Sequence, residues 1–154
     1  MVKAIVVTGS VCTGKTTIAK KISRKYKYNY IDVNKLIKDK KLYEGYDDEF
    51  DSYIVDEKKL VKFLKNLIDK SKKKLVIDSH MGHYLPKKYV EVCVVTKCDL
   101  KELKRRLKKR RYKQNKIREN LDAEIFDTCL IEAKEKGHTV RIIDTTKGSK
   151  EVIL

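Results

Sequence analysis

Short apolar runs alternate with one-sided helical patterns along the chain. Five runs rich in β-branched residues predict buried strands, at residues 3–8, 28–31, 74–78, 90–96 and 139–144. Between them, apolar residues recur at helical spacing, as at Leu60, Leu64 and Leu67. The pattern predicts four helices, over residues 14–26, over residues 56–70, from the N-cap Asp99, and over residues 116–137 with Gly137 as the C-cap.

This alternation predicts an α/β fold. Five short apolar strands separated by helices favour a mainly parallel sheet with helices on both faces, a three-layer sandwich. A single proline, no Ser/Gly-rich linker and no internal repeat in 154 residues favour one domain over residues 1–154. Ligands bind beyond the carboxyl ends of the strands in such sheets, so candidate chemistry is expected at that edge.

Residues 9–16, GSVCTGKT, match the phosphate-binding pattern GxxxxGK[ST] between a predicted strand and a predicted helix. Gly9 and Gly14 permit backbone angles that side chains forbid, so that successive N–H groups and the helix N-terminus can cradle phosphate oxygens. Lys15 is expected on the β- and γ-phosphates and the Thr16 hydroxyl on Mg²⁺. We therefore expect binding of a nucleoside triphosphate, ATP first. The other expected ATP contacts in this loop are Cys12, Thr13 and Thr17.

Cys12 stands where many small kinases carry glycine, although its backbone N–H can still serve a phosphate. Two interpretations of its thiol remain open. The helix N-terminus could lower its pKa and make it reactive. A plain packed thiol is the interpretation we favour.

A carboxylate and an imidazole follow the third predicted strand, which ends at Asp78 and is followed by Ser79 and His80. Asp78 beside the phosphate loop fits the role of holding Mg²⁺ directly or through water, and a turn-capping aspartate is the alternative. His80 could orient a water molecule, contact the acceptor, or be a structural histidine. No further ligands are spaced for a zinc site.

The net charge is +16, from 38 Lys and Arg against 22 Asp and Glu. Such an excess attracts polyanions such as RNA or nucleotides, but a lysine-rich surface without such a partner explains it equally well. Four cysteines without a CxxC pair, and no secretory or membrane-spanning pattern, favour a reducing cytoplasmic setting and no membrane.

Five stretches, in order, resemble the type-6 adenylate kinases, a small archaeal and eukaryotic nuclear family of adenylate kinases and ATPases linked to small-ribosomal-subunit assembly. They are GSVCTGKTT from Gly9, LYEGYDDEFDSYIVDEKKL over 42–60, VIDSH over 76–80 with the trailing Pro86, RLKKRRY over 106–112 and KIRENLDAEIF over 116–126. The loop alone identifies only the P-loop NTPase superfamily. The acidic stretch combined with DxH and ENxxAEI is much more specific.

The resemblance implies a P-loop core with a nucleoside monophosphate (NMP)-binding segment at about 32–55 and a lid at about 110–118. It implies that Arg110 first, and Arg106 second, stabilise the transferring phosphate, with Arg110 also counted among the ATP contacts. It also implies that the loop containing Lys147 packs against adenine. Together with these arginines, the catalytic candidates are Lys15, Asp78 and His80.

The expected acceptor contacts are Asp32, Tyr46, Asp56 and His80. The acidic run over residues 43–56 could bind acceptor hydroxyls or a basic protein partner, or it could be a solvated loop. Family members often carry a further terminal helix, so a chain that stops at Leu154 implies a shortened C-terminus.

The activity implied is Mg²⁺-dependent, reversible phosphoryl transfer from ATP to AMP that gives two ADP, with ATPase activity and a role in small-subunit rRNA maturation, in a monomer or weak dimer. Two alternatives stay open. One is an assembly ATPase that binds a ribosomal protein or rRNA. The other is a P-loop kinase acting on a metabolite hydroxyl, for which Asp32 would be the candidate base.

Overall fold

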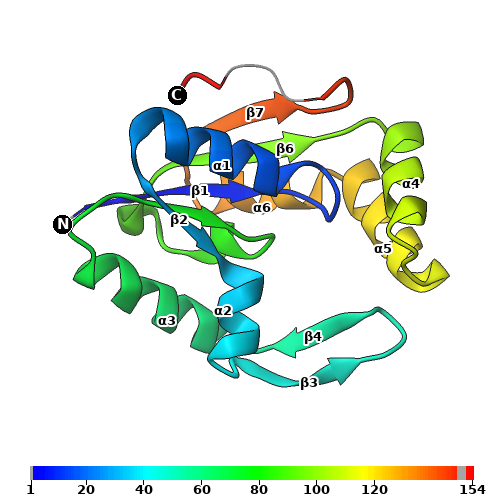
Figure 1. The fold of residues 1–154 in the computed structure, drawn as a ribbon, viewed down its shortest axis with the longest axis horizontal. Helices are drawn as coiled ribbons and strands as arrows, with labels where there is room; N and C mark the ends of the chain where they lie inside the picture. The colour runs from blue at the N-terminus through cyan, green and yellow to red at the C-terminus, as the bar shows by residue number, and fades with distance from the viewer. Residues whose placement is uncertain (1, 149–151) are drawn as a thin grey trace.

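The central sheet consists of five parallel strands in the order β2-β5-β1-β6-β7 (Figure 1). The computed structural model describes residues 2–148 and 152–154. The strands are β1 (Ala4–Thr8), β2 (Asn29–Asp32), β5 (Leu75–Asp78), β6 (Val90–Lys97) and β7 (Val140–Asp144). Each begins and ends within about one residue of a predicted run, so the predicted α/β sheet is confirmed.

The middle strand β1 is buried throughout, and apolar from Ala4 to Val7, because both of its faces are covered. Ala4 and Val6 belong to a core with α3 (Glu57–Lys70) and α6 (Thr128–Glu135). Ile5 and Val7 point to the opposite core, where they meet the buried residues of α1 (Lys15–Tyr26). The three-layer sandwich predicted from the sequence follows from this alternation.

Aspartate side chains cap the N-termini of α3 and α4 (Leu100–Lys109). The Asp99 carboxylate accepts the Glu102 N–H at 2.8 Å at the start of α4, as predicted. Asp56 accepts the N–H groups of Lys58 and Lys59, at 2.9 and 3.2 Å, and so starts α3. Both aspartates satisfy amide groups that the first helical turn leaves unpaired.

The prediction of one helix over residues 116–137 is wrong. The chain forms α5 (Gln114–Ile125) and then α6, separated by Asp127 in the left-handed conformation at φ +51°. Aspartate tolerates this region better than most residues. The break turns α6 back onto the sheet, where Ala133 is buried, and Gly137 at φ +81° follows the end of α6. The apolar pattern runs through the break and gives no sign of it.

The segment between β2 and α3 contains elements that the apolar pattern did not predict. A short helix, α2 (Val33–Asp39), leads into an antiparallel hairpin of β3 (Tyr43–Asp47) and β4 (Ser52–Val55), which projects away from the sheet (Figure 1). We call residues 43–55 the acidic hairpin. Two short 3₁₀ turns, Gly82–Tyr84 and Lys87–Tyr89, connect β5 to β6.

Across residues 2–148 and 152–154, none of the helices combines the length and the apolar character that crossing a membrane requires.

Replacing the cap of α3 should destabilise the protein. Asp56→Ala removes the acceptor for two backbone N–H groups, and we expect the free energy of unfolding to fall by about 1 kcal/mol. Asp56→Asn keeps an acceptor of similar capping strength and should lose much less. Urea unfolding of the two variants measures the difference, and equal losses would show that the cap is not the cause.

Candidate active site

The phosphate-binding loop links the end of β1 to the start of α1. Gly9 adopts φ +147°, and a Cβ there would lie 2.4 Å from Thr96 Oγ1. Gly14, at φ +91°, is the residue before α1. Both glycines are therefore required by geometry, as the sequence pattern predicted.

Lys15 folds back over its own loop. Its ammonium donates to the carbonyl oxygens of Gly9 at 3.0 Å and Ser10 at 2.9 Å. Burial lowers the pKa of Lys15 below its ordinary value, and the Asp78 carboxylate opposes that shift. The positive charge is thus held at the mouth of the N–H cradle, where phosphate oxygens would bind.

Asp78 gathers two hydroxyl groups at the carboxyl end of β5. Its Oδ2 accepts from Thr16 Oγ1 at 2.7 Å and from the Tyr30 hydroxyl at 2.6 Å. Burial and this bond raise the pKa of Tyr30, so the phenol stays protonated and donates. Thr16 and Asp78 supply hard oxygen atoms of the kind that Mg²⁺ prefers. Tyr30 was not predicted from the sequence.

His80 follows Asp78 by two residues, and part of its surface is exposed to solvent. Desolvation by surrounding groups, together with the positive charge of Lys15, lowers the pKa of His80 to about 4. The imidazole is therefore neutral at pH 7, and it can donate or accept one hydrogen bond without adding charge.

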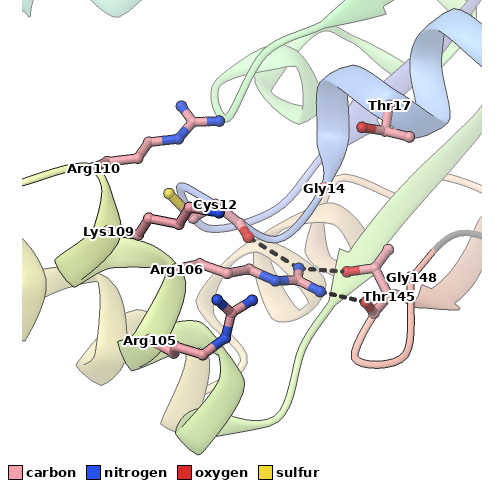
Figure 2. Close-up of a pocket in the computed structure, with 9 residues that line it drawn as sticks. All are labelled: Cys12, Gly14, Thr17, Arg105, Arg106, Lys109, Arg110, Thr145 and Gly148. Atoms are coloured by element: carbon pink, nitrogen blue, oxygen red, sulfur yellow. Dashed lines mark hydrogen bonds between the residues drawn. The ribbon is translucent and has the colours of Figure 1, made fainter.

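A pocket of about 600 Å³ opens between the loop and α4 (Figure 2). Cys12, Gly14 and Thr17 line one side of it. Basic side chains from α4 and its C-terminal end line the other, namely Arg105, Arg106, Lys109 and Arg110. Its volume suits a small ligand, and its charge suits an anionic one.

Arg106 connects three segments around this pocket. Its Nη1 donates to the Cys12 carbonyl oxygen at 3.2 Å and to Thr145 Oγ1 at 3.1 Å (Figure 2). These bonds hold the guanidinium against the phosphate loop and the turn after β7. In that turn, Thr145 and Gly148 line the pocket and Lys147 is exposed.

Arg110 ends α4, and the next residue, Arg111, adopts φ +58°. This conformation favours glycine, so the turn between α4 and α5 is held in a strained geometry. The predicted lid at about 110–118 therefore coincides with a sharp turn and the first residues of α5.

The proposed acceptor residues lie in different settings. Asp32 ends β2 in register with Asp78 on the neighbouring strand, and it caps α2 through the Lys35 N–H at 3.2 Å. Tyr46 lies on the acidic hairpin, 50% exposed, with its ring edge-on to Tyr53. Asp56 is the cap of α3. Of the three, Asp32 is at the strand end where the phosphate site forms.

Two further polar residues contact the loop from α5. Asn120 and Glu124 are buried, and they accept hydrogen bonds from the Val11 N–H at 3.0 Å and from Ser10 Oγ at 3.3 Å. Both belong to the ENLDAEI stretch. Their spacing of four residues puts two polar side chains on the same face of a helix, and this spacing could have marked them as contact residues from the sequence.

Cys12 adopts φ +69° within the phosphate loop, between Gly9 and Gly14. Burial raises the pKa of its thiol despite the opposing charges of Arg110 and Lys15. The thiol is therefore neutral at pH 7, which favours the packed-thiol interpretation over a reactive one.

Comparison with known proteins identifies the family. The family description of an AAA domain matches residues 5–127. A Methanocaldococcus jannaschii protein, provisionally named an adenylate kinase, is 39% identical over 150 residues, which cover 97% of this chain and 81% of that protein. The "Adenylate kinase isoenzyme 6 homolog" of Dictyostelium discoideum is 38% identical, over 84% of this chain and 73% of its own. The chain belongs to the adenylate kinase isoenzyme 6 family.

Another member of the isoenzyme 6 family, "Adenylate kinase isoenzyme 6 homolog FAP7" of Saccharomyces cerevisiae, is 34% identical over 96% of this chain and 74% of its own. Two solved structures share the fold at lower identity. YorR of Bacillus subtilis in complex with phosphorylated GDP has a TM-score of 0.57 at 17% identity, over 92% of this chain and 85% of that one. Shikimate kinase of Bacteroides thetaiotaomicron has a TM-score of 0.55 at 16% sequence identity, and the match covers 92% of this chain and 86% of that one.

Removing the Tyr30 hydroxyl should weaken the Mg²⁺ binding that we predict for Asp78 in this isoenzyme 6 family member. Tyr30→Phe leaves the carboxylate with one hydroxyl donor fewer and a less fixed orientation. We expect the Mg²⁺ concentration that half-saturates ATP binding to rise about 3-fold or more. A Mg²⁺ titration measures it, with Tyr28→Phe on the same segment as the control. An unchanged midpoint would remove Tyr30 from the site.

Proposed function

We propose that this protein is an adenylate kinase that transfers the γ-phosphoryl group of ATP to AMP, reversibly, giving two ADP. The observation that carries the proposal is the pairing of the phosphate loop with a basic wall from α4 across one pocket. This arrangement suits a triphosphate bound between Lys15 on one side and the α4 arginines on the other. The names of the family relatives point to the same activity.

The proposed mechanism needs little acid–base chemistry, because a phosphate oxygen of AMP is already ionised at neutral pH. Catalysis is then positioning and electrostatic stabilisation of charge on the transferring group. Lys15 and Arg110 would supply positive charge, and Arg106 would hold the loop and the turn after β7 in place. Thr16 and Asp78 would hold Mg²⁺, whose charge would neutralise phosphate oxygens.

The acceptor side of the proposal rests on neutral and acidic groups. Asp32, at the strand end beside Asp78, is suited to accept hydrogen bonds from a nucleoside rather than to bind a phosphate. His80 is neutral at pH 7 and can contact the acceptor without repelling Lys15. The acidic hairpin would close over the acceptor.

Product analysis with Mg-ATP, with and without AMP, tests the proposal. We expect rapid, stoichiometric formation of two ADP from each ATP and AMP pair, and none with a Lys15→Met variant. Slow ADP formation without consumption of AMP would contradict it. That result would instead support an ATPase, with Asp78 and His80 orienting water.

A second function is favoured by the +16 charge of the chain. We propose that the protein also binds rRNA, in keeping with a role in small-subunit maturation. Phosphate contacts release counterions, so affinity for an rRNA fragment should fall at least about tenfold between 50 and 200 mM salt. Filter binding over this range measures the slope. A shallow slope would contradict an electrostatic RNA interface.

A further inference from the structure

Helix α5 begins against the tip of the acidic hairpin. The Lys113 N–H at its N-cap donates to Asp51 Oδ2 at 3.0 Å, and the Asn115 amide donates to Glu49 at 2.9 Å. The Lys116 ammonium donates to the Asp51 carbonyl oxygen at 2.8 Å. These bonds join residues more than 60 positions apart in the sequence. The contact between the hairpin and α5 is therefore a tertiary contact.

The same helix contacts the phosphate loop one turn further along. Asn120 Oδ1 accepts the Val11 N–H at 3.0 Å, while its Nδ2 donates to the Lys116 carbonyl oxygen at 2.9 Å, which fixes the orientation of the amide. After another turn, Glu124 accepts from the Cys98 N–H at 2.8 Å and from Ser10 Oγ at 3.3 Å. The helix therefore meets the loop and the end of β6 together.

Lys116, Asn120 and Glu124 are spaced by four residues and form one face of α5, which we call the polar stripe. They are 9%, 8% and 7% exposed. A buried helix face is ordinarily apolar, since burial of a polar or charged group costs free energy unless each group finds a partner. Here the partners lie in the acidic hairpin, in the phosphate loop and at the end of β6.

We propose that the polar stripe couples the acidic hairpin to the phosphate loop, with Asn120 as the positioning residue at the loop and Lys116 as the positioning residue at the hairpin. The coupling half of this inference rests on the proposed acceptor role of the hairpin. The loop half does not, because it concerns only the geometry of the phosphate cradle.

Asn120 acts on the phosphate loop through its hydrogen bond with the Val11 N–H. This N–H lies in the peptide that joins Ser10 to Val11, one residue before Cys12, which is held at φ +69°. The orientation of that peptide therefore affects the direction in which the following N–H groups point. With its N–H bonded to Asn120, the Val11 peptide is turned away from the cradle. Without this acceptor the peptide is free to rotate, and the N–H groups that follow lose their common direction.

Binding of inorganic tripolyphosphate and of adenosine, each measured by calorimetry, tests the loop half. Asn120→Ala should weaken tripolyphosphate binding about 3- to 10-fold, the effect of one lost hydrogen bond, and leave adenosine binding unchanged. Asn66→Ala, on the exposed side of α3, is the matched control and should change neither. Unchanged tripolyphosphate affinity in folded Asn120→Ala protein would overturn the inference.

Glu124→Gln is a second variant that keeps the size of the side chain and one acceptor. It should weaken tripolyphosphate binding by about 3-fold, which is the lower end of the loss expected for Asn120→Ala. It decides the matter if Asn120→Ala fails to fold. A Glu124→Gln protein with unchanged tripolyphosphate affinity would then overturn the loop half.

The coupling half is tested by the affinity for a non-hydrolysable ATP analogue with and without AMP. In the unaltered protein AMP should raise this affinity about 5-fold or more, and in Lys116→Met or Asn120→Ala the ratio should fall towards one. Lys62→Met on α3 is the charge-matched control. A ratio that persists in both stripe variants would overturn the coupling. Failure of AMP to bind the unaltered protein would instead contradict the proposed function and the coupling together, while leaving the tripolyphosphate result to stand.

Discussion

A phosphate-binding loop can aim its N–H groups at a ligand only if its own carbonyl and hydroxyl groups find partners elsewhere. In this protein Thr13 Oγ1 donates to the Ser10 carbonyl oxygen at 2.6 Å, and Thr145 Oγ1 donates to the Thr13 carbonyl oxygen at 2.7 Å. The Arg106 guanidinium donates a hydrogen bond to the Cys12 carbonyl oxygen. Much of the rest of the fold brings such partners to the loop, from β6, the turn after β7, α4 and α5.

Charge is unevenly distributed around this loop. Between residues 43 and 56 the chain carries acidic side chains and no lysine or arginine, whereas α4 and the turn that follows it are strongly basic. Opposite charges of this kind attract over roughly 10 Å at ordinary salt. The hairpin is therefore drawn towards the start of α5, and a strongly basic protein keeps one acidic arm at the site where it would meet a nucleoside.

The sheet could be predicted from the sequence because a strand covered on both faces is almost entirely apolar, as residues 4–7 of β1 are. The loop could be predicted because its glycines are required by backbone geometry. The break at Asp127 could not, since a single left-handed residue leaves the apolar spacing intact. Tyr30, Asn120 and Glu124 were missed for a different reason. Their roles depend on partners between 26 and 114 residues away, which only the folded chain brings together.

The left-handed residue Asp127 separates two helices that contact different parts of the protein. Helix α6 packs on the sheet, while α5 contacts both the acidic hairpin and the phosphate loop. The left-handed conformation of Asp127 allows the two helices to run in different directions within a connection of two residues. Lys97, at the end of β6, pairs with both Glu124 and Asp127 and so holds the junction of the two helices against the sheet. The same junction thus separates a helix that contacts the loop from one that packs in the core, and ion pairs to β6 fix where they meet.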